Sequence, residues 1–208
     1  MLIQMPRQIS FPNGQQKHER NMETDTDKLA FEGEKNTMLF TENLETPILT
    51  IRSWRKSDKD FTLSLWGDKE NGKYMSDPVR ENMDEAYLNC VDEMEDNPEG
   101  YYLVVEWKED RTPVGTCCIF PENGNYDIGY CISKDRWREG LGTEVVDAII
   151  RWVKEEGGKS ITGEVADINL ASVALLRKFG FLEDRKTRYK KWGDETYFDA
   201  HYYKLNLE

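Results

Sequence analysis

Histidine and cysteine are scarce in this sequence. Its 208 residues include two histidines, His18 and His201, which lie far apart along the chain. They offer little for a metal site or for a serine–histidine nucleophile. None of the cysteines has CxxC spacing, so we expect buried reduced thiols and no disulfides or metal ligands. The cysteines are Cys90, Cys117, Cys118 and Cys131. The sequence therefore indicates chemistry that uses no metal.

Positive charge is also in short supply, with 28 basic residues against 40 acidic ones and a formal net charge of −12. Tight binding to nucleic acid requires a basic surface, so we expect no nucleic-acid partner. A cationic partner would be attracted over long range, although a solvated acidic surface explains the charge more simply. No run of 18 apolar residues occurs, and the first nine residues lack the basic-then-apolar order of a secretory signal. These absences favour a cytoplasmic protein with no membrane partner.

Composition divides the chain into two parts. Residues 1–45 are rich in Gln, Asn, Glu, Asp and Thr and contain only brief apolar pairs, which predicts a flexible or peripherally docked extension. Within residues 46–208, apolar residues recur with the periods of strands and helices. A chain of this length can bury one good hydrophobic core, so we interpret 46–208 as a single domain.

The periodic part predicts elements in the order β-α-α-β-β-β-α-β-α-β-β, a mixed α/β arrangement. The clearest helical pattern covers 143–154, where five apolar side chains fall on one face before Gly157 and Gly158. Strands are favoured where β-branched and aromatic residues gather between turns. The expected strands are 47–54, 101–107, 114–120, 126–133, 160–165, 185–192 and 196–207, and the other helices are 59–66, 84–94 and 170–179.

The loop before the helix at 143–154 carries the sequence Trp137-Arg138-Glu139-Gly140-Leu141-Gly142-Thr143. A loop that ends at a helix N-terminus presents unpaired N–H groups beside the positive end of the helix dipole, which suits a diphosphate. Glycine lets a phosphate approach the backbone closely. A G-x-G pair alone is equally typical of a tight turn, and the loop lacks residues that a Walker A loop or a dinucleotide fingerprint requires. We interpret it as a phosphate-binding loop of another type.

Three separated motifs, taken in order, resemble the GNAT N-acetyltransferase superfamily, and within it the branch of ribosomal-protein N-terminal acetyltransferases. They are Asp127-Ile128-Gly129-Tyr130, Trp137-x-x-Gly140-x-Gly142-Thr143-Glu144, and Asn169-x-x-Ser172 followed by Arg177-Lys178-Phe179-Gly180-Phe181. The similarity covers roughly residues 46–208. It implies an α+β GNAT fold, whose central mixed, mostly antiparallel sheet splays apart between strands four and five. It also implies an acyl-CoA-dependent N-acetyltransferase with acetyl-CoA as the acetyl-donating cosubstrate.

The resemblance implies where acetyl-CoA binds. The pantetheine arm would lie in the opening between the splayed strands and pair with main-chain groups, and loop amides would hold the pyrophosphate. Asn169 would hydrogen-bond the pantetheine arm, and Glu139, where the family usually has a small or basic residue, would have to point away from the phosphates. The residues expected to contact the cofactor are Cys131, Ile132, Ser133, Trp137, Arg138, Glu139, Gly140, Leu141, Gly142, Thr143, Asn169 and Ser172.

Acetyl transfer to an amine requires a proton acceptor for the ammonium and a proton donor for the departing thiolate. Asp127 matches an acidic position of the family and Glu164 falls on the fifth strand, so both are candidates for base or ammonium anchor. Ordinary solvent-facing strand carboxylates would look the same. Many family members supply the donor from a tyrosine whose position here is Leu176. Ser172 matches a serine proposed for thiol protonation or positioning, and it also suits a first-turn helix contact.

The acceptor amine is expected on the side opposite acetyl-CoA, between the first two helices and the last hairpin. A cleft rich in aromatic rings and carboxylates would favour a cation, although any one of these aromatic residues can equally be core. Candidate lining residues are Trp66, Tyr74, Met75, Tyr87, Tyr130 and Trp192.

These inferences predict transfer of the acetyl group to a primary amine by direct attack in a ternary complex. The amine would be a peptide or protein N-terminus, or a small polyamine or aminoglycoside-like amine. The alternative is a catalytically weak CoA-binding sensor or scaffold, which Leu176 and Glu139 make conceivable. An acetyltransferase that acts on aminoacyl-tRNA is disfavoured by the negative charge. A homodimer through the hairpin at 185–207 is a further hypothesis.

Overall fold

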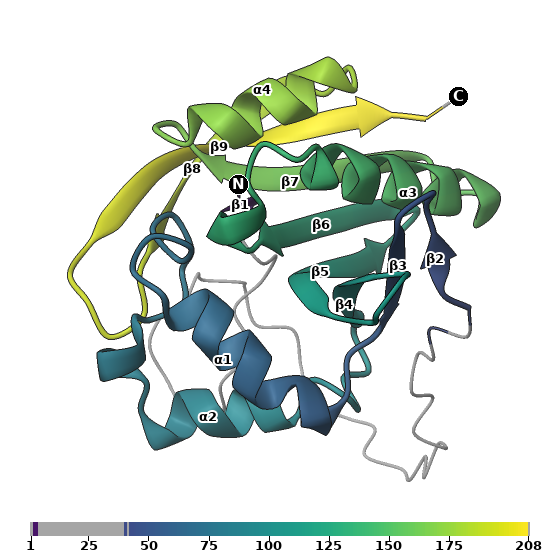
Figure 1. Cartoon of the computed structure of the whole chain (residues 1–208). Helices are drawn as coiled ribbons and strands as arrows, with labels where there is room; N and C mark the ends of the chain where they lie inside the picture. Colours follow the sequence, from purple (N-terminus) through teal and green to yellow (C-terminus); the bar gives the residue numbers. More distant parts are fainter. Residues whose placement is uncertain (1, 4–39, 41, 208) are drawn as a thin grey trace, which may run out of the picture.

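The fold is organised around one mixed sheet (Figure 1). The computed structural model describes residues 2–3, 40 and 42–207. Within these residues, nine strands form the sheet; the order β2-β3-β4-β5-β6-β7-β9-β8 runs from edge to edge, and β1 pairs with β6 off this path. Neighbouring strands pair antiparallel, except that β6 and β7 are parallel.

From β3 onward the strands and α-helices follow the predicted order β-α-α-β-β-β-α-β-α-β-β, so the predicted fold class is confirmed. The strands are β1 (Leu2–Ile3), β2 (Leu44–Glu45), β3 (Leu49–Ser53), β4 (Tyr101–Trp107), β5 (Pro113–Glu122), β6 (Asn125–Ile132), β7 (Ser160–Ala166), β8 (Leu182–Lys190) and β9 (Tyr197–Asn206). The helices are α1 (Lys59–Gly67), α2 (Glu85–Asp92), α3 (Leu141–Glu155) and α4 (Leu170–Lys178), with short 3-10 helices at Lys56–Asp58, Arg80–Asn82 and Lys134–Arg136.

Helices cover both faces of the sheet, with α3 and α4 on one face and α1 and α2 on the other (Figure 1). Side chains alternate across each strand, so neighbours in β6 serve different faces. Tyr130 and Ile132 pack in the cluster beneath α3 and α4, whereas Cys131 packs with α1 and α2. On the predicted apolar face of α3, Val145, Val146, Ile149 and Val153 are buried and Ile150 is partly buried. The sheet therefore separates two cores, and strand β6 borders both.

The parallel pair β6 and β7 separates after three residue pairs. Residues 125–127 pair with residues 160–162, and within the described chain the two strands have no further pairing. Strand β7 stays in the sheet because its other edge pairs with β9 as far as Ala166. The sheet is therefore open between the fourth and fifth strands counted from β3, where the splay was predicted.

The short strand β1 lies at this opening. Leu2 pairs with Cys131 and Ile3 with Tyr130 in antiparallel register. At the other end of the predicted extension, Leu44–Glu45 pairs with β3, so regular structure begins two residues before the predicted domain boundary. Most of 1–45 lies outside the described residues, and the division into extension and domain stays a prediction.

The β8–β9 hairpin bends over the edge of the sheet toward the segment that follows α1 (Figure 1). Tyr189 Oη donates a hydrogen bond to Tyr74 O at 2.6 Å, and Trp192 N donates to Ser76 O at 2.6 Å. The segment between α1 and α2 is therefore held by the end of the hairpin, more than a hundred residues away in sequence.

Candidate active site

Five consecutive backbone N–H groups, from Arg138 to Gly142, have no hydrogen-bond acceptor among the described residues. The groups on either side are bonded, because Trp137 N donates to Lys134 O at 3.1 Å and Thr143 N donates to Gly140 O at 2.9 Å. The first N–H groups of α3 have no intrahelical acceptor, and they lie at the positive end of the helix dipole. This arrangement suits an anion.

The loop conformation depends on two residues with left-handed backbone. Arg138 has a φ of 70° and Gly140 a φ of 83°. A Cβ built on Gly140 would meet no atom within 4 Å, so the glycine is favoured here by its backbone angle and not by crowding. Trp137 anchors the start of the loop, because its Nε1 donates to Ile132 O at 2.7 Å.

A cavity of about 520 Å³ borders this loop. Its wall includes three basic side chains, from Lys73, Arg136 and Arg138, beside the free amides of the loop. Basic side chains and free amides are the groups that recognise phosphates. The other lining residues are Glu70, Tyr74, Ile132, Trp137, Gly140, Leu141, Gly142, Asn169 and Ala171. The cavity thus gathers much of the predicted cofactor site, and it adds Lys73 and Arg136, which sequence reasoning missed.

The remaining predicted cofactor residues lie outside the cavity wall. Glu139 is exposed, and its Oε1 lies 3.8 Å from Arg136 Nη1. The Ser133 N–H already donates to Val114 O at 2.9 Å. Thr143 is half-buried, and Cys131 is a buried free thiol whose pKa is raised by burial. A thiol held in its neutral form is a poor nucleophile, which disfavours an acetyl-cysteine route.

Asn169 and Ser172 begin helix α4 beside the cavity. Asn169 is the N-cap residue, and its side-chain oxygen accepts from Ser172 N at 3.4 Å. Both residues are buried. The Ser172 side chain acts on the buried Tyr130 hydroxyl, opposing the rise in the pKa of Tyr130 that burial causes. The tyrosine therefore stays protonated at neutral pH.

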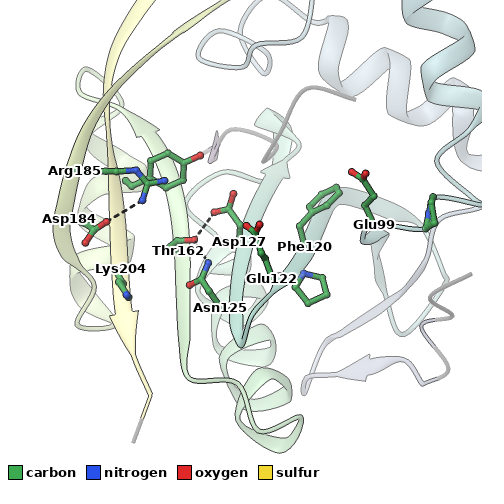
Figure 2. A pocket seen from close by; sticks show the side chains of 12 residues that line it. Glu99, Phe120, Glu122, Asn125, Asp127, Thr162, Asp184, Arg185 and Lys204 are labelled. Atoms are coloured by element: carbon green, nitrogen blue, oxygen red, sulfur yellow. Dashed lines mark hydrogen bonds and ion pairs between the residues drawn. The ribbon is translucent and has the colours of Figure 1, made fainter. Parts of the chain in front are cut away.

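Asp127 lines a second cavity of about 530 Å³ on the α1 and α2 face of the sheet (Figure 2). Thr162 Oγ1 donates to Asp127 Oδ1 at 2.8 Å, across the last residue pair before the strands separate. The cavity wall carries four carboxylates and two cations. Those residues are Glu99, Glu122, Asp127, Asp184, Arg185 and Lys204.

Glu164 lies two residues farther along β7 than Thr162, and therefore on the same face of the sheet. It is buried opposite Tyr202 of β9. Burial raises the pKa of Glu164, while a hydrogen bond from Thr187 and the charge of Arg185 oppose the rise. The two predicted carboxylates thus occupy one face at the point where β6 leaves β7.

The described residues include no group of three His, Cys, Asp or Glu side chains placed to hold a metal ion. In the same part of the chain, every helix is too short or too polar to span a membrane.

Comparison with known proteins assigns the family. The model of the acetyltransferase (GNAT) domain matches residues 49–182. The chain belongs to the GNAT acetyltransferase family. It is an acetyl-CoA-dependent N-acetyltransferase, as the resemblance predicted. Among its relatives is the N-acetyltransferase p20 of Bacillus licheniformis, itself uncharacterised, which is 26% identical over 69% of this chain and 84% of the relative.

Solved GNAT structures share the fold. A proposed ribosomal-protein-serine acetyltransferase from Vibrio cholerae superposes with a TM-score of 0.63 at 16% identity, covering 80% of this chain and 98% of the other. A spermidine N-acetyltransferase from Vibrio cholerae, solved with CoA and spermine, superposes with a TM-score of 0.61 at 17% identity, covering 76% and 95%. At these identities the likeness extends to the fold alone.

The aromatic residues predicted to line a GNAT acceptor cleft are mostly core residues. Trp66 and Tyr87 are buried and turn their polar atoms to protein partners: Trp66 Nε1 donates to Thr116 Oγ1 at 2.9 Å, and Tyr87 Oη donates to Asp77 Oδ1 at 2.8 Å. Met75 is buried with them, Trp192 packs against their cluster, and Tyr130 lies in the core on the opposite face. Tyr74 lines the cavity beside the phosphate-binding loop.

Sequence reasoning also passed over Asp77, in the segment between α1 and α2. Its Oδ2 atom is enclosed by protein and has no hydrogen-bond partner among the described groups. Asp77 is followed by proline in a segment without periodicity, which is typical of a turn, and no local pattern marks it out. Its environment comes from α2 and from the distant β8–β9 hairpin.

Proposed function

We propose that this GNAT enzyme transfers the acetyl group of acetyl-CoA to a primary amine by direct attack in a ternary complex. The observation that carries the proposal is the row of five free N–H groups from Arg138 to Gly142, beside a cavity with three basic side chains. These donors suit the paired phosphates of CoA, and the open edge of β6 leads from the loop toward the interior of the sheet.

Acetyl-CoA supplies the activated acyl group when it is bound. The amides of Arg138–Gly142 would hold its pyrophosphate, and Lys73 and Arg136 would balance the phosphate charge. The side chain of Asn169 would position the pantetheine arm. The main chain of β6 at Tyr130 and Cys131 already pairs with β1, so the arm would either displace Leu2–Ile3 or pair beyond them, at Ile132.

Proton transfers are assigned to groups on the two faces of β6. The Ser172 hydroxyl, which lies beside the protonated Tyr130 hydroxyl, would deliver a proton to the departing thiolate. Asp127 and Glu164 face the other side, where they would attract the acceptor's ammonium group or accept its proton.

The acceptor is proposed to be a cationic amine, either a peptide or protein N-terminus or a small polyamine. The cavity that Asp127 lines has an excess of carboxylates, which suits a cation (Figure 2). Among the structural relatives, one is named for ribosomal-protein serine and another for spermidine, so both classes of amine belong in the test.

One observation favours a second candidate, a CoA-binding sensor with weak turnover. Leu176, at the position where many family members have a tyrosine acid, is completely buried in the core. A chain without that acid could bind CoA and release thiol slowly. In this reading, Ser172 would only cap its helix.

Steady-state release of free thiol from acetyl-CoA separates the two candidates. The panel contains a peptide with a free N-terminus, the same peptide with its N-terminus blocked, spermidine, and an aminoglycoside. The enzyme proposal predicts thiol release that depends on the amine and a product heavier by one acetyl group. CoA binding by calorimetry, together with no thiol release from any amine, would contradict it and favour the sensor.

A further inference from the structure

Asp77 carries a buried carboxylate oxygen that lacks a hydrogen-bond donor. Tyr87 Oη donates to Asp77 Oδ1 at 2.8 Å, which satisfies one oxygen of the carboxylate. The other oxygen, Oδ2, is enclosed and unpaired within the described chain. A buried carboxylate oxygen without a donor is costly, and such groups are rare in folded proteins. Its retention points to a donor that arrives with a ligand.

The segment that carries Asp77 is held by the end of the β8–β9 hairpin. Trp192 N donates to Ser76 O at 2.6 Å, which fixes the residue just before Asp77. Lys191 Nζ donates to Gly72 O at 2.8 Å and to Met75 O at 3.1 Å. Its cation therefore attracts Asp77 electrostatically, but its hydrogen bonds go to these two carbonyl groups. The hairpin therefore holds the segment around Asp77 but supplies no hydrogen bond to Asp77 Oδ2.

The charge of this carboxylate is felt on the strands that lead to the opening in the sheet. Its negative charge contributes to the raised pKa values of Tyr102 on β4, Cys118 on β5 and Cys131 on β6. Cys131 lies four residues beyond Asp127, the last β6 residue that pairs with β7. Asp77 therefore acts on the released part of β6, from the face opposite α3 and α4.

We propose that Asp77 Oδ2 binds the ammonium group of the acceptor and takes its proton before the amine attacks acetyl-CoA. The inference rests on the proposed function and deepens it, because it assigns the acceptor to the class of primary ammonium ions. Asp127 and Glu164 each already have a threonine hydroxyl as partner, whereas Asp77 Oδ2 has no hydrogen-bond donor among the described residues. An ammonium ion would supply that donor and neutralise the buried charge.

The step balances as follows. One proton passes from the ammonium to Asp77, and the freed nitrogen lone pair forms the C–N bond with the acetyl carbon. The C–S bond breaks, and its electron pair leaves with sulfur. A second proton from the nitrogen ends on the sulfur, which gives the amide and the free thiol of CoA. Asp77 then releases its proton to solvent.

The pKa of Asp77 is raised by burial, with the Tyr87 hydrogen bond and the charge of Lys191 acting against the rise. A raised pKa suits a general base, and it places the loss of activity on acidification above the usual range of a carboxyl group. Burial raises the pKa values of the tyrosines and thiols around Asp77, so these groups titrate far above the range of a carboxyl group. The titratable groups that face it are Tyr87, Tyr102, Cys118, Cys131 and Lys191.

The test compares Asp77→Asn with Asp96→Asn, which removes the same charge from an exposed turn after α2. The asparagine keeps an oxygen that can accept from Tyr87, so the fold is expected to persist. We expect kcat/KM for the amine to fall at least about 100-fold in Asp77→Asn, which is the usual loss when a general base is removed. The affinity for CoA and the melting temperature should not fall, and Asp96→Asn should behave as wild type.

An Asp77→Glu variant gives a second readout that does not depend on the folding of the asparagine variant. It keeps the carboxylate but moves it by one methylene, so kcat should fall while the acid limb of the pH profile remains. If the wild-type enzyme turns over, two results would overturn the inference and leave the proposed function standing. One is a kcat/KM of Asp77→Asn within about threefold of wild type, and the other is an unchanged kcat in Asp77→Glu. Absence of amine-dependent thiol release by wild type would contradict both.

Discussion

Replacing Gly140 by alanine tests the predicted phosphate-binding loop, and the same replacement at Gly157, beyond the other end of α3, is the control. Gly140 precedes α3 with a φ of 83°, and Gly157 follows α3 with a φ of 73°. A Cβ added at either position would meet no atom within 4 Å, so alanine introduces no clash at either site. Left-handed backbone costs an alanine about 1–2 kcal/mol, and both variants should lose a similar amount of unfolding free energy.

Only Gly140→Ala should weaken CoA binding. Relaxation of its φ would turn the free amides of Arg138–Gly142 away from their common direction, and each lost hydrogen bond to a charged phosphate is worth ~1.5–3 kcal/mol. One such loss corresponds to at least about a tenfold rise in Kd. Calorimetric titration with CoA and thermal unfolding of both variants provide the two measurements. Equal CoA affinity in Gly140→Ala and Gly157→Ala, with matched losses of stability, would refute the reasoning.

Three further predictions follow from the cavity, from Glu164 and from β1. Lys73→Ala and Arg136→Ala should each raise the CoA Kd at low ionic strength, and the difference should shrink at about 0.5 M salt because both side chains are exposed; an effect independent of salt would argue against direct charge recognition. Burial raises the pKa of Glu164, so the stability linked to its protonated form is present below the unfolded pKa and is lost as pH rises through the folded pKa. Glu164→Gln should therefore raise the melting temperature relative to wild type at pH 8 and not at pH 4, and a difference that does not change with pH would contradict this. Shortening the chain by residues 1–3 removes β1 from Tyr130 and Cys131, so CoA should bind more tightly, and unchanged or weaker binding would mean that β1 and CoA do not compete.

The order of elements could be predicted because each long element carries its own period. The apolar stripe of α3 and the strands of the sheet bury the side chains that their spacing indicates. The two-residue strands β1 and β2 could not be predicted, since two residues show no period and pair only because an open strand edge is near. Residue 45 therefore marks a change in composition, whereas the sheet begins at Leu44.

The free amides of residues 138–142 could be expected from the sequence because they depend on local backbone, which Gly140 and Gly142 mark. The acceptor side was harder, because aromatic residues such as Trp66 and Tyr87 serve a core and a cleft equally well in composition. Hydrogen bonds to buried partners show that these two residues belong to the core, and the partners lie in other segments of the chain. Asp77 is the extreme case, since α2 and the turn of the β8–β9 hairpin together create its environment.

The central claim is that the free amides between Trp137 and Thr143 hold the phosphates of CoA. The most direct test is an amide ¹H–¹⁵N titration of the protein with CoA. We predict that the resonances of Arg138, Glu139, Gly140, Leu141 and Gly142 shift most and saturate together, with slower hydrogen exchange in the complex. Saturating CoA that leaves those five amides unmoved while other regions respond would contradict the claim.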